Sequence, residues 1–261
     1  MKKSKKALII ALILILIGTA IAAVVFAVGG SEIILSKSEF SKTTTVITEK
    51  FSKVEIAEEG GDVLLLPSAD EKCSVVSYDG ELVSHSIKNA DGVLKIERTD
   101  GRRWYEKILP ARNDNGIILY LPAADIESVE ITTSSGDIKV GAFNAKPDLL
   151  YCESSSGDID LNAVTADYCL ISTSSGDISA DNSDISIMHA AATSGDMDFE
   201  SICISLDIFA NSSSGDIELE NVTVERDLIV ETTSGDIELE NVTVNGKRNI
   251  KTSSGDVSYG N

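Results

Sequence analysis

Basic residues are scarce in this chain of 261 residues, which carries 22 Lys and Arg against 42 Asp and Glu and has a formal net charge of −20. The only charges among the first 28 residues are Lys2, Lys3, Lys5 and Lys6. Removing these four from the 22 leaves 18 basic and 42 acidic residues, a net charge of −24 on the rest of the chain. Contacts to phosphate need Lys and Arg, so the composition argues against nucleic-acid binding and favours cations or basic partners.

Histidine and cysteine are also rare. A Ser-His-Asp site needs a His within reach, and the chain offers only His85 and His189, of which His189 falls at an outward position and is expected as a surface residue. Zinc sites typically contain a C-x-x-C motif. That spacing does not occur among Cys73, Cys152, Cys169 and Cys203. The carboxylates are periodic, so no acid pair stands out for glycan cleavage. We therefore expect no enzyme, no catalytic residue and no cofactor-binding residue.

What the chain has in abundance is the tripeptide Ser-Gly-Asp, which occurs seven times between Ser135 and Asp256. From one Asp to the next, the steps are 21, 19, 19, 20, 20 and 20 residues. A fixed period near 20 residues is typical of repeat proteins in which each unit stacks on its neighbour.

Alignment on the Asp shows apolar residues at every second position on both sides of it. One and three residues after the Asp they include Ile159 and Leu161, and six and eight residues before it Ile171 and Cys169. This alternation is typical of half-buried strands, and the Gly in each period leaves no helical stripe. The sequence predicts an all-β, single-domain β-solenoid of ~20-residue repeats, in which each unit contributes two or three short strands.

The same alignment predicts the environment of the turn and of two cysteines. We expect Gly to supply a positive-φ corner, and Ser and Asp to bond backbone N–H groups there. Cys152 and Cys169 fall in inward columns of adjacent rungs, two residues out of register. That offset corresponds to ~8 Å between Cα atoms, which is too far for an unstrained disulfide, so both are expected as small core residues.

Stacking would also place the repeat carboxylates in a file with ~4.8 Å spacing, where like charges repel. Further acidic residues, among them Asp198, Glu218 and Glu238, increase this repulsion. Either hydrogen bonds to backbone N–H groups and Ser hydroxyls offset it, or calcium does. The calcium candidates are Asp137, Asp158, Asp177, Asp196, Asp216, Asp236 and Asp256.

The N-terminus contains a long apolar run. Residues 1–6 form a basic tail, and residues 7–28 carry no charge and would span ~33 Å as a helix, enough to cross a bilayer. We expect a signal-anchor helix with a cytoplasmic N-terminus, which makes the chain a single-pass membrane protein with an extracellular C-terminal domain. The alternative is a cleaved signal peptide with a small-residue site at Ala20-Ile21-Ala22.

Beyond this segment we expect a polar tether over residues 29–45, an irregular N-terminal β part over 46–128 and the regular repeats over 129–261. Residues 98–115 break the repeat pattern with a locally basic, aromatic stretch. Arg102, Arg103, Trp104 and Tyr105 are our candidates for partner contact there, because such residues suit interfaces. The alternative is a long hairpin loop whose Trp packs over the end of the solenoid.

The Ser-Ser-Gly-Asp-Ile core, followed by an acidic and an apolar position, resembles the bacterial putative-adhesin family of β-strand repeat proteins. The resemblance runs from about Val46 to the last residue and includes the degenerate turn Gly60-Gly61-Asp62-Val63. It implies a surface-exposed β-solenoid of a family of unknown molecular function, in some cases associated with envelope-stress operons. It supplies no catalytic residue.

Together these features predict a membrane-anchored extracytoplasmic β-solenoid that acts as a non-catalytic, adhesin-like surface-binding module. Its partners would be the membrane, through the N-terminal helix, and a cell-envelope component or another protein, and the solenoid end offers a site of self-association. The alternative is a regulatory or sensor component of a cell-envelope stress response that contacts a membrane signalling protein or cationic peptides.

Overall fold

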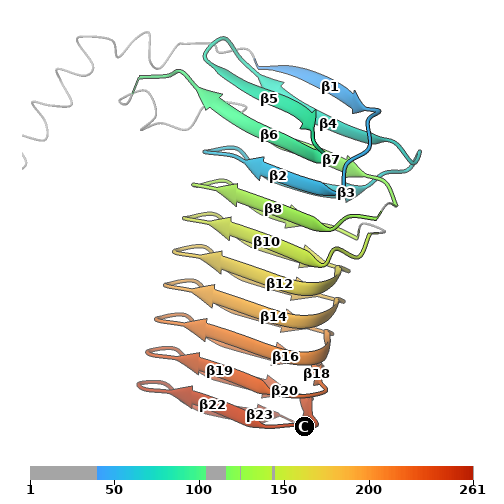
Figure 1. Cartoon of the computed structure of the whole chain (residues 1–261). Coiled ribbons are helices and arrows are strands. Elements are labelled where there is room, and N and C mark those ends of the chain that lie inside the picture. Colours follow the sequence, from blue (N-terminus) through green and yellow to red (C-terminus); the bar gives the residue numbers. More distant parts are fainter. Residues whose placement is uncertain (1–39, 104–115, 124, 143–144, 261) are drawn as a thin grey trace, which may run out of the picture. The chain divides into compact units, whose positions relative to one another are not determined.

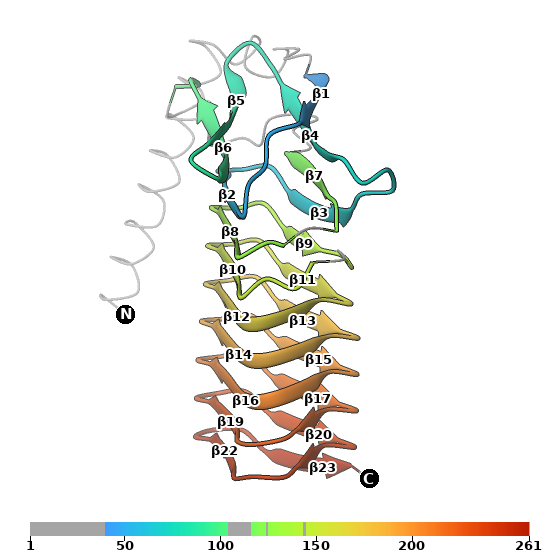
Figure 2. The ribbon, with the colours of Figure 1, turned by 45° about the vertical axis from the view of Figure 1, so that its right-hand side comes forward.

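The computed structural model describes residues 40–103, 116–123, 125–142 and 145–260. The predicted anchor at 7–28 lies outside the described residues. Phe40–Arg102 and the described residues from Gly116 onward form one compact unit. This unit is all β: two sheets face each other in a β-solenoid of about seven turns (Figures 1 and 2). In the described residues, no helix has the length and apolar character that crossing a membrane requires.

One wall of the solenoid is an 11-stranded sheet whose strands follow the Ser-Gly-Asp turns in the repeat region. Its spatial order is β1 (Ser41–Ile47), β4 (Cys73–Asp79), β7 (Ile117–Leu121), β3 (Val63–Pro67), β9 (Ile138–Val140), β11 (Ile159–Asn162), β13 (Ile178–Asp181), β15 (Met197–Glu200), β17 (Ile217–Glu220), β20 (Ile237–Glu240) and β23 (Val257–Gly260).

The other wall is a 12-stranded sheet whose strands precede those turns in the repeat region. It runs β5 (Val83–Ala90), β6 (Val93–Asp100), β2 (Lys53–Ala57), β8 (Ser128–Thr133), β10 (Leu149–Ser154), β12 (Thr165–Thr173), β14 (Asp184–Ala192), β16 (Cys203–Ser212), and continues as the short pair β18 (Thr223–Val224) and β21 (Thr243–Val244) beside β19 (Leu228–Thr232) and β22 (Arg248–Thr252).

From β8 onward the coils stack in chain order with all neighbours parallel, as the repeat predicts. The N-terminal part differs. The coil β2–β3 lies between the β6–β7 coil and the β8–β9 coil (Figure 2). The second coil in the chain therefore stacks on one side of the first coil, and the third coil stacks on its other side. The antiparallel pairs β1–β4, β4–β7 and β5–β6 form this end of the unit. The strand β1 begins at Ser41, within the stretch expected as a tether, and its β-branched Thr residues suit pairing with β4.

The space between the two walls is filled by the columns that the alternation predicts. Ile159, Leu161, Ile171 and Cys169 are all buried, and the equivalent residues of neighbouring coils stack on them. A single coil cannot bury its own apolar side chains, because they are covered by the coils stacked above and below it. The core is therefore one continuous column, and its stability depends on stacking.

The turn differs from the prediction in the role of its glycine. Among the described glycines only Gly92 and Gly116 have a positive φ, so the repeat glycines do not provide a left-handed corner. They are required by close approach instead: a Cβ on Gly176 would lie 2.0 Å from the carbonyl oxygen of Gly157 in the adjacent coil. The left-handed corner lies five residues after the repeat Asp, where Asn221 has φ 56° and Asn241 φ 53°.

A hydroxyl three residues before the repeat Gly holds most of the turns closed, and the exception is the turn at Gly195, where Ala192 occupies this position. The Thr173 hydroxyl accepts a hydrogen bond from the Gly176 N–H at 3.1 Å and donates one to the Gly157 carbonyl at 3.3 Å. The same pair of bonds recurs at Ser154, Ser212, Thr232 and Thr252. The hydroxyl thus links its turn to the preceding coil and satisfies two backbone groups inside the stack.

Candidate functional site

The repeat aspartates form a hydrogen-bonded ladder. The Oδ1 atom of each Asp accepts the backbone N–H of the Asp in the next coil, as in Asp177 with the Asp196 N–H at 2.9 Å. The ladder begins at Asp62, whose Oδ1 accepts the Asp137 N–H at 3.0 Å across 75 residues of sequence. It continues through Asp137, Asp158, Asp177, Asp196, Asp216 and Asp236 to the N–H of Asp256. Each of these bonds satisfies a backbone N–H of the adjacent coil and so links one coil to the next.

These seven repeat aspartates are the residues that the sequence offers for calcium. Among the described residues, no group of three or more His, Cys, Asp and Glu side chains is arranged to hold a metal ion. Six of the seven carboxylates already bond the backbone of the next coil through Oδ1. Calcium binding along the ladder stays a prediction, and it would have to use the oxygens that the ladder leaves over.

Of the four candidate contact residues, the structure describes Arg102 and Arg103, which follow β6. Arg102 is held by Asp100: its Nε lies 3.0 Å from both carboxylate oxygens, and one terminal nitrogen lies 2.6 Å from Oδ2. The Arg102 side chain is only 17% exposed, so this guanidinium contributes to the structure of the strand end. Arg103 is exposed. Trp104 and Tyr105 lie outside the described residues, so their part in a contact surface stays a prediction.

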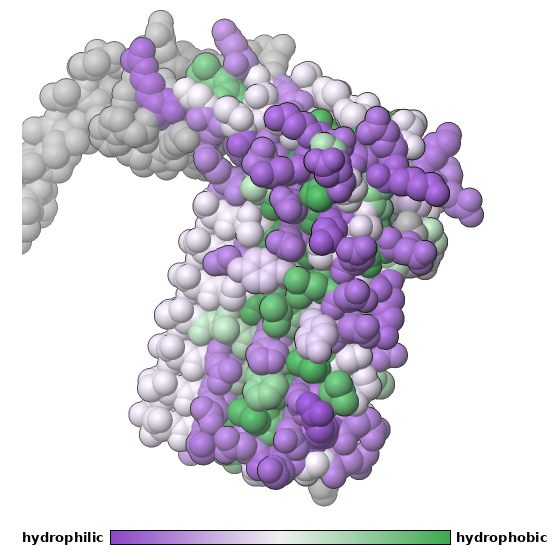
Figure 3. Space-filling model, viewed as in Figure 1, coloured by the Kyte–Doolittle hydropathy of each residue, from purple (hydrophilic) through white to green (hydrophobic). Residues whose placement is uncertain are grey.

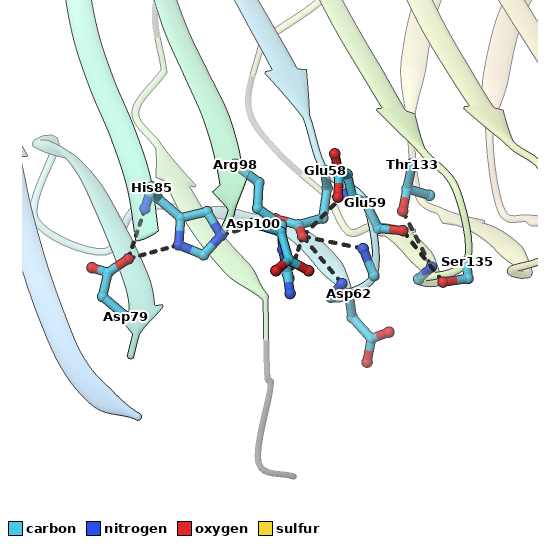
Figure 4. A network of polar contacts seen from close by, with 12 residues as sticks. Glu58, Glu59, Asp62, Asp79, His85, Arg98, Asp100, Thr133 and Ser135 are labelled. Atoms are coloured by element: carbon cyan, nitrogen blue, oxygen red, sulfur yellow. Dashed lines mark hydrogen bonds and ion pairs between the residues drawn. The ribbon is translucent and has the colours of Figure 1, made fainter. Parts of the chain in front are cut away.

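A buried cluster of charged side chains lies at the N-terminal end of the solenoid (Figure 4). The His85 ring on β5 contacts Glu58 Oε2 through Nε2 and Asp79 Oδ1 through Nδ1, each at 2.9 Å. Arg98 on β6 donates a 2.6 Å hydrogen bond to the other oxygen of Glu58, Oε1. The side chains of Glu58 and His85 are fully buried, and that of Arg98 is 1% exposed.

Glu58 occupies the column that holds a Ser or Thr hydroxyl in every Ser-Gly-Asp coil but the one with Ala192. It lies three residues before Gly61, and its Oε1 accepts the N–H groups of Glu59 at 3.1 Å, Gly60 at 3.4 Å and Gly61 at 3.1 Å. Here a carboxylate replaces the hydroxyl and is long enough to reach the hairpin β5–β6 as well. The cluster therefore fastens that hairpin to the first turn of the solenoid.

The charges of the cluster are mutually compensated. Burial raises the pKa of Glu58, but the hydrogen bond from His85 and the charge of Arg98 outweigh it, and the pKa is lowered overall. Burial lowers the pKa of His85, but its hydrogen bonds to Glu58 and Asp79 outweigh this and leave the pKa raised. The favoured state is an imidazolium between two carboxylates, a structural ion cluster without a free nucleophile.

The outward face of the 12-stranded sheet carries a partly exposed apolar band, which we call the outer stripe. Seven residues before the repeat Asp, the side chains in register are Tyr151, Leu170, His189, Phe209 and Ile229. Two residues earlier in each strand, β10, β12 and β14 add Leu149, Tyr168 and Ile187. The His189 and Phe209 rings stack with centroids 4.4 Å apart. Figure 3 shows this face, with green and pale side chains running down the middle of the coils and purple ones beside them.

The outer stripe is solvent-facing and continuous over five strands, β10, β12, β14, β16 and β19. Tyr168 is 51% exposed and His189 is exposed, and the other members of the stripe are half-buried. In β16 a bulge inserts one residue relative to β14, between the pairs Ile185–Ile204 and Ile187–Asp207, and Leu206 within it is 37% exposed. A bulge re-aims side chains locally, and this one adds an apolar group at the margin of the stripe.

Carboxylates border the outer stripe. Asp167, Asp207 and Glu231 form ion pairs with Lys146, Arg226 and Lys251. In the described part of the chain, Glu130, Asp148, Glu153 and Asp184 have no ion-pair partner, and Glu153 accepts a 2.5 Å hydrogen bond from the Tyr151 hydroxyl. The apolar band thus has an anionic margin.

The outward face of the 11-stranded sheet is different in character. Two adjacent columns carry carboxylates in register over successive coils: Asp198, Glu218 and Glu238 in one, and Glu200, Glu220 and Glu240 in the other. Partial burial raises the pKa of Glu218, and the charges of Asp198 and Glu238 raise it further. We call this surface the acidic face.

The cysteines do not form a site. Cys73, Cys152 and Cys169 are buried, and Cys203 is exposed. Cys152 pairs with Ile171 and Cys169 with Leu150, so the two thiols lie two residues out of register, as the repeat predicts. Burial raises the pKa of the Cys73 and Cys169 thiols to about 12, which keeps them protonated and unreactive.

Sequence reasoning missed the outer stripe and the buried cluster. The stripe had a signal: the column seven before the Asp changes from Glu130 through Tyr151 and Leu170 to Phe209 and Ile229, which is unusual for an outward position. The cluster had none, because its partners are 27 and 40 residues apart outside any repeat.

Comparison with known proteins identifies the architecture. Residues 51–261 match the Toastrack DUF4097 family. A search of curated proteins finds no match. Among solved structures, a putative adhesin from Bacteroides fragilis aligns with TM-score 0.53 and 15% identity over 84% of this chain and 97% of that one. A putative adhesin from Parabacteroides distasonis gives TM-score 0.52 and 11% identity over 85% and 97%. A putative lipid binding protein from the same organism gives 0.50 and 16% over 84% and 97%. At these identities the likeness shows the fold.

Proposed function

The chain belongs to the Toastrack DUF4097 family, and from this premise we propose that it is a membrane-anchored extracytoplasmic module that binds surfaces without catalysis. The observation that carries the proposal is the outer stripe, an apolar band that faces solvent on an otherwise polar, acidic solenoid. Contiguous exposed apolar surface on a protein of this kind is typical of interaction sites. The adhesin names of two similar structures support the same role.

Membrane anchoring rests on the sequence. The uncharged residues 7–28 follow a basic hexapeptide, which by the positive-inside rule leaves the solenoid on the outer side. The single exposed cysteine among the four provides a test of this location. On intact cells, a membrane-impermeant maleimide should label Cys203, and Cys203→Ser should abolish the labelling. Labelling only after lysis would place the solenoid in the cytoplasm.

The surface-binding role is tested by sedimentation. Residues 30–261 are mixed with wall and membrane fractions of the source cell, with and without calcium. We expect co-sedimentation that decreases when Tyr168→Ser and Phe209→Ser are combined. Absence of sedimentation with every fraction would contradict binding to the cell's own envelope and redirect the search to foreign surfaces.

The regulatory alternative is favoured by the acidic face. Carboxylates in register over several coils attract cationic peptides, which a sensor of envelope stress would meet at the cell surface. Deletion of the gene separates the two functions, because an envelope-stress reporter should respond abnormally to wall-active antibiotics only if the chain acts in signalling.

A further inference from the structure

The outer stripe has dimensions that suit one class of occupant. It spans five parallel strands, so at ~4.8 Å between neighbours it is ~19 Å long. Over β10, β12 and β14 it is two columns wide, or ~7 Å between Cα positions along a strand, and at β16 the second column continues with Asp207. The backbone groups of the interior strands are all paired within the sheet, so an added β-strand finds no free hydrogen-bonding groups here. A sheet face is covered by a second layer, and an amphipathic helix is the simplest such layer.

A helix that lies across the strands matches the spacing of the stripe. Its turns repeat every ~5.4 Å against the ~4.8 Å of the rungs, so each turn of its apolar face meets about one rung. At 1.5 Å per residue, ~19 Å corresponds to about 13 residues, or between three and four turns. Tyr151, Leu170, Phe209 and Ile229 would then contact successive apolar positions of the helix.

The carboxylates beside the outer stripe favour a partner with positive charge. Glu130, Asp148, Glu153 and Asp184 border the stripe without an ion-pair partner in the described residues, and the whole chain carries −20. A second copy of this chain would bring the same negative charge to the contact, and an anionic lipid surface would be repelled as well. A helix with Lys or Arg beside its apolar face is attracted.

We propose that the outer stripe is the docking surface for a cationic amphipathic helix of about 13 residues. This inference rests on the proposed surface-binding function and names its partner class. The stripe supplies the apolar contact, and the carboxylates at its margin orient the helix and exclude anionic partners.

The test uses the full chain in a neutral detergent, with empty micelles as the blank. The probe is a fluorescent 14-residue peptide with Leu on one helical face and Lys beside it. A second peptide keeps the Leu face and replaces every Lys by Glu. We expect anisotropy to report binding of the Lys peptide alone, and circular dichroism to show that it gains helicity on the protein.

Protein variants locate the contact. Tyr168→Ser combined with Phe209→Ser should weaken binding at least about tenfold, or ~1.4 kcal/mol. Tyr259→Ser removes a Tyr outside the stripe that is 64% exposed, against 51% for Tyr168, and should leave the affinity unchanged. Asp184→Asn with Glu130→Gln should weaken binding at low salt and less at high salt. Unfolding curves of every variant show that the solenoid is intact.

The proposal is overturned if the Glu peptide binds as well as the Lys peptide, or if the variant with Tyr168→Ser and Phe209→Ser keeps full affinity. It is also overturned if the chain binds protein-free phosphatidylcholine vesicles through the stripe, or if the chain self-associates and this double variant does not. If the envelope fractions sediment the chain and the Lys peptide does not bind, this inference fails and the surface-binding function stands. If Cys203 is labelled only after lysis, the proposed location fails whatever the peptide does.

Discussion

At the scale of single residues, the repeat glycines are fixed by contact with the neighbouring coil. A Cβ on Gly176 would meet the Gly157 carbonyl oxygen at 2.0 Å and its carbon at 2.4 Å, both backbone atoms that cannot move aside cheaply. We expect Gly176→Ala to lower the free energy of unfolding by about 3 kcal/mol or more, since overpacking against backbone separates two coils. Thermal unfolding followed by circular dichroism measures this.

The control is Gly60→Ala. The nearest atom to a Cβ there is the Ser135 Oγ at 3.8 Å, an ordinary contact. Its Tm should stay close to that of the parent chain. Equal losses in both variants would mean that the repeat glycines serve flexibility and not close approach.

Two substitutions in the aspartate ladder distinguish a role in hydrogen bonding from a role in metal binding. Asp177→Asn keeps an Oδ1 acceptor for the Asp196 N–H and removes one charge from the file, so stability should be unchanged or slightly higher. Asp177→Ala removes the acceptor and should cost about 1 kcal/mol. Thermal melts with calcium and with a chelator complete the test. A calcium-dependent rise in Tm that Asp177→Asn abolishes would establish the ladder as a metal site.

At the scale of elements, the buried cluster makes the attachment of the β5–β6 hairpin depend on pH. His85 faces Glu58 after β2 and Asp79 at the end of β4, while Arg98 on β6 bonds the same Glu58. The pKa of His85 is raised, so its contribution to stability is complete below the ordinary value of 6.5 and is lost as the pH rises through the higher folded value. The pKa of Glu58 is lowered from 4.5, so its contribution is present above 4.5 and is lost as the pH falls below it.

Stability should therefore be greatest between these limits and fall on the alkaline side by about 2 kcal/mol, the value of a hydrogen bond to a charged group. His85→Gln should remove the alkaline decline and lower stability at pH 6. Chemical denaturation across pH 4 to about 9 measures the profile. His189→Gln, on the outward face beside Phe209, is the matched control and should keep the shape of the profile. An unchanged profile in His85→Gln would show that another group is responsible.

Elements also show what the sequence could predict. The alternation around each Asp predicted strands such as β11 and β12 and their buried side chains, because a period-two pattern repeated in seven units leaves one consistent arrangement. The place of β2–β3 between β6–β7 and β8–β9 could not be predicted. It depends on contacts such as that between Asp62 and Asp137, across 75 residues, and local periodicity carries no information on which coil lies beside which.

The candidate site divides in the same way. The outer stripe could have been predicted from one column of the repeat alignment, because in-register stacking turns one repeat position into a band on the surface. The partners of Glu58 come from a hairpin that belongs to no repeat, so its environment emerged only from the tertiary structure.

At the scale of the whole unit, charge is distributed unevenly between the two walls. Burial and the charges of Asp198 and Glu238 raise the pKa of Glu218, so the folded state holds this proton more tightly and stability falls as the pH rises from 4.5 through the folded value. At neutral pH, Glu218→Gln should raise Tm by about 1–2 °C at low salt, and less at high salt as screening removes the repulsion. Glu49→Gln, away from this column, should have no such salt-dependent effect. A lower Tm in Glu218→Gln would mean that the carboxylates of the acidic face are held together by bound cations.

The stacked coils have a mechanical consequence. The coils from β8 onward are tied to their neighbours by backbone bonds, hydroxyls and the aspartate ladder, but not to coils further away. A tensile load that pulls the chain out at one end of this stack would therefore detach one coil at a time, each releasing about 20 residues or ~70 Å of extended chain. Such a stack yields in steps under load and dissipates work at each step, while the coils that remain stay folded.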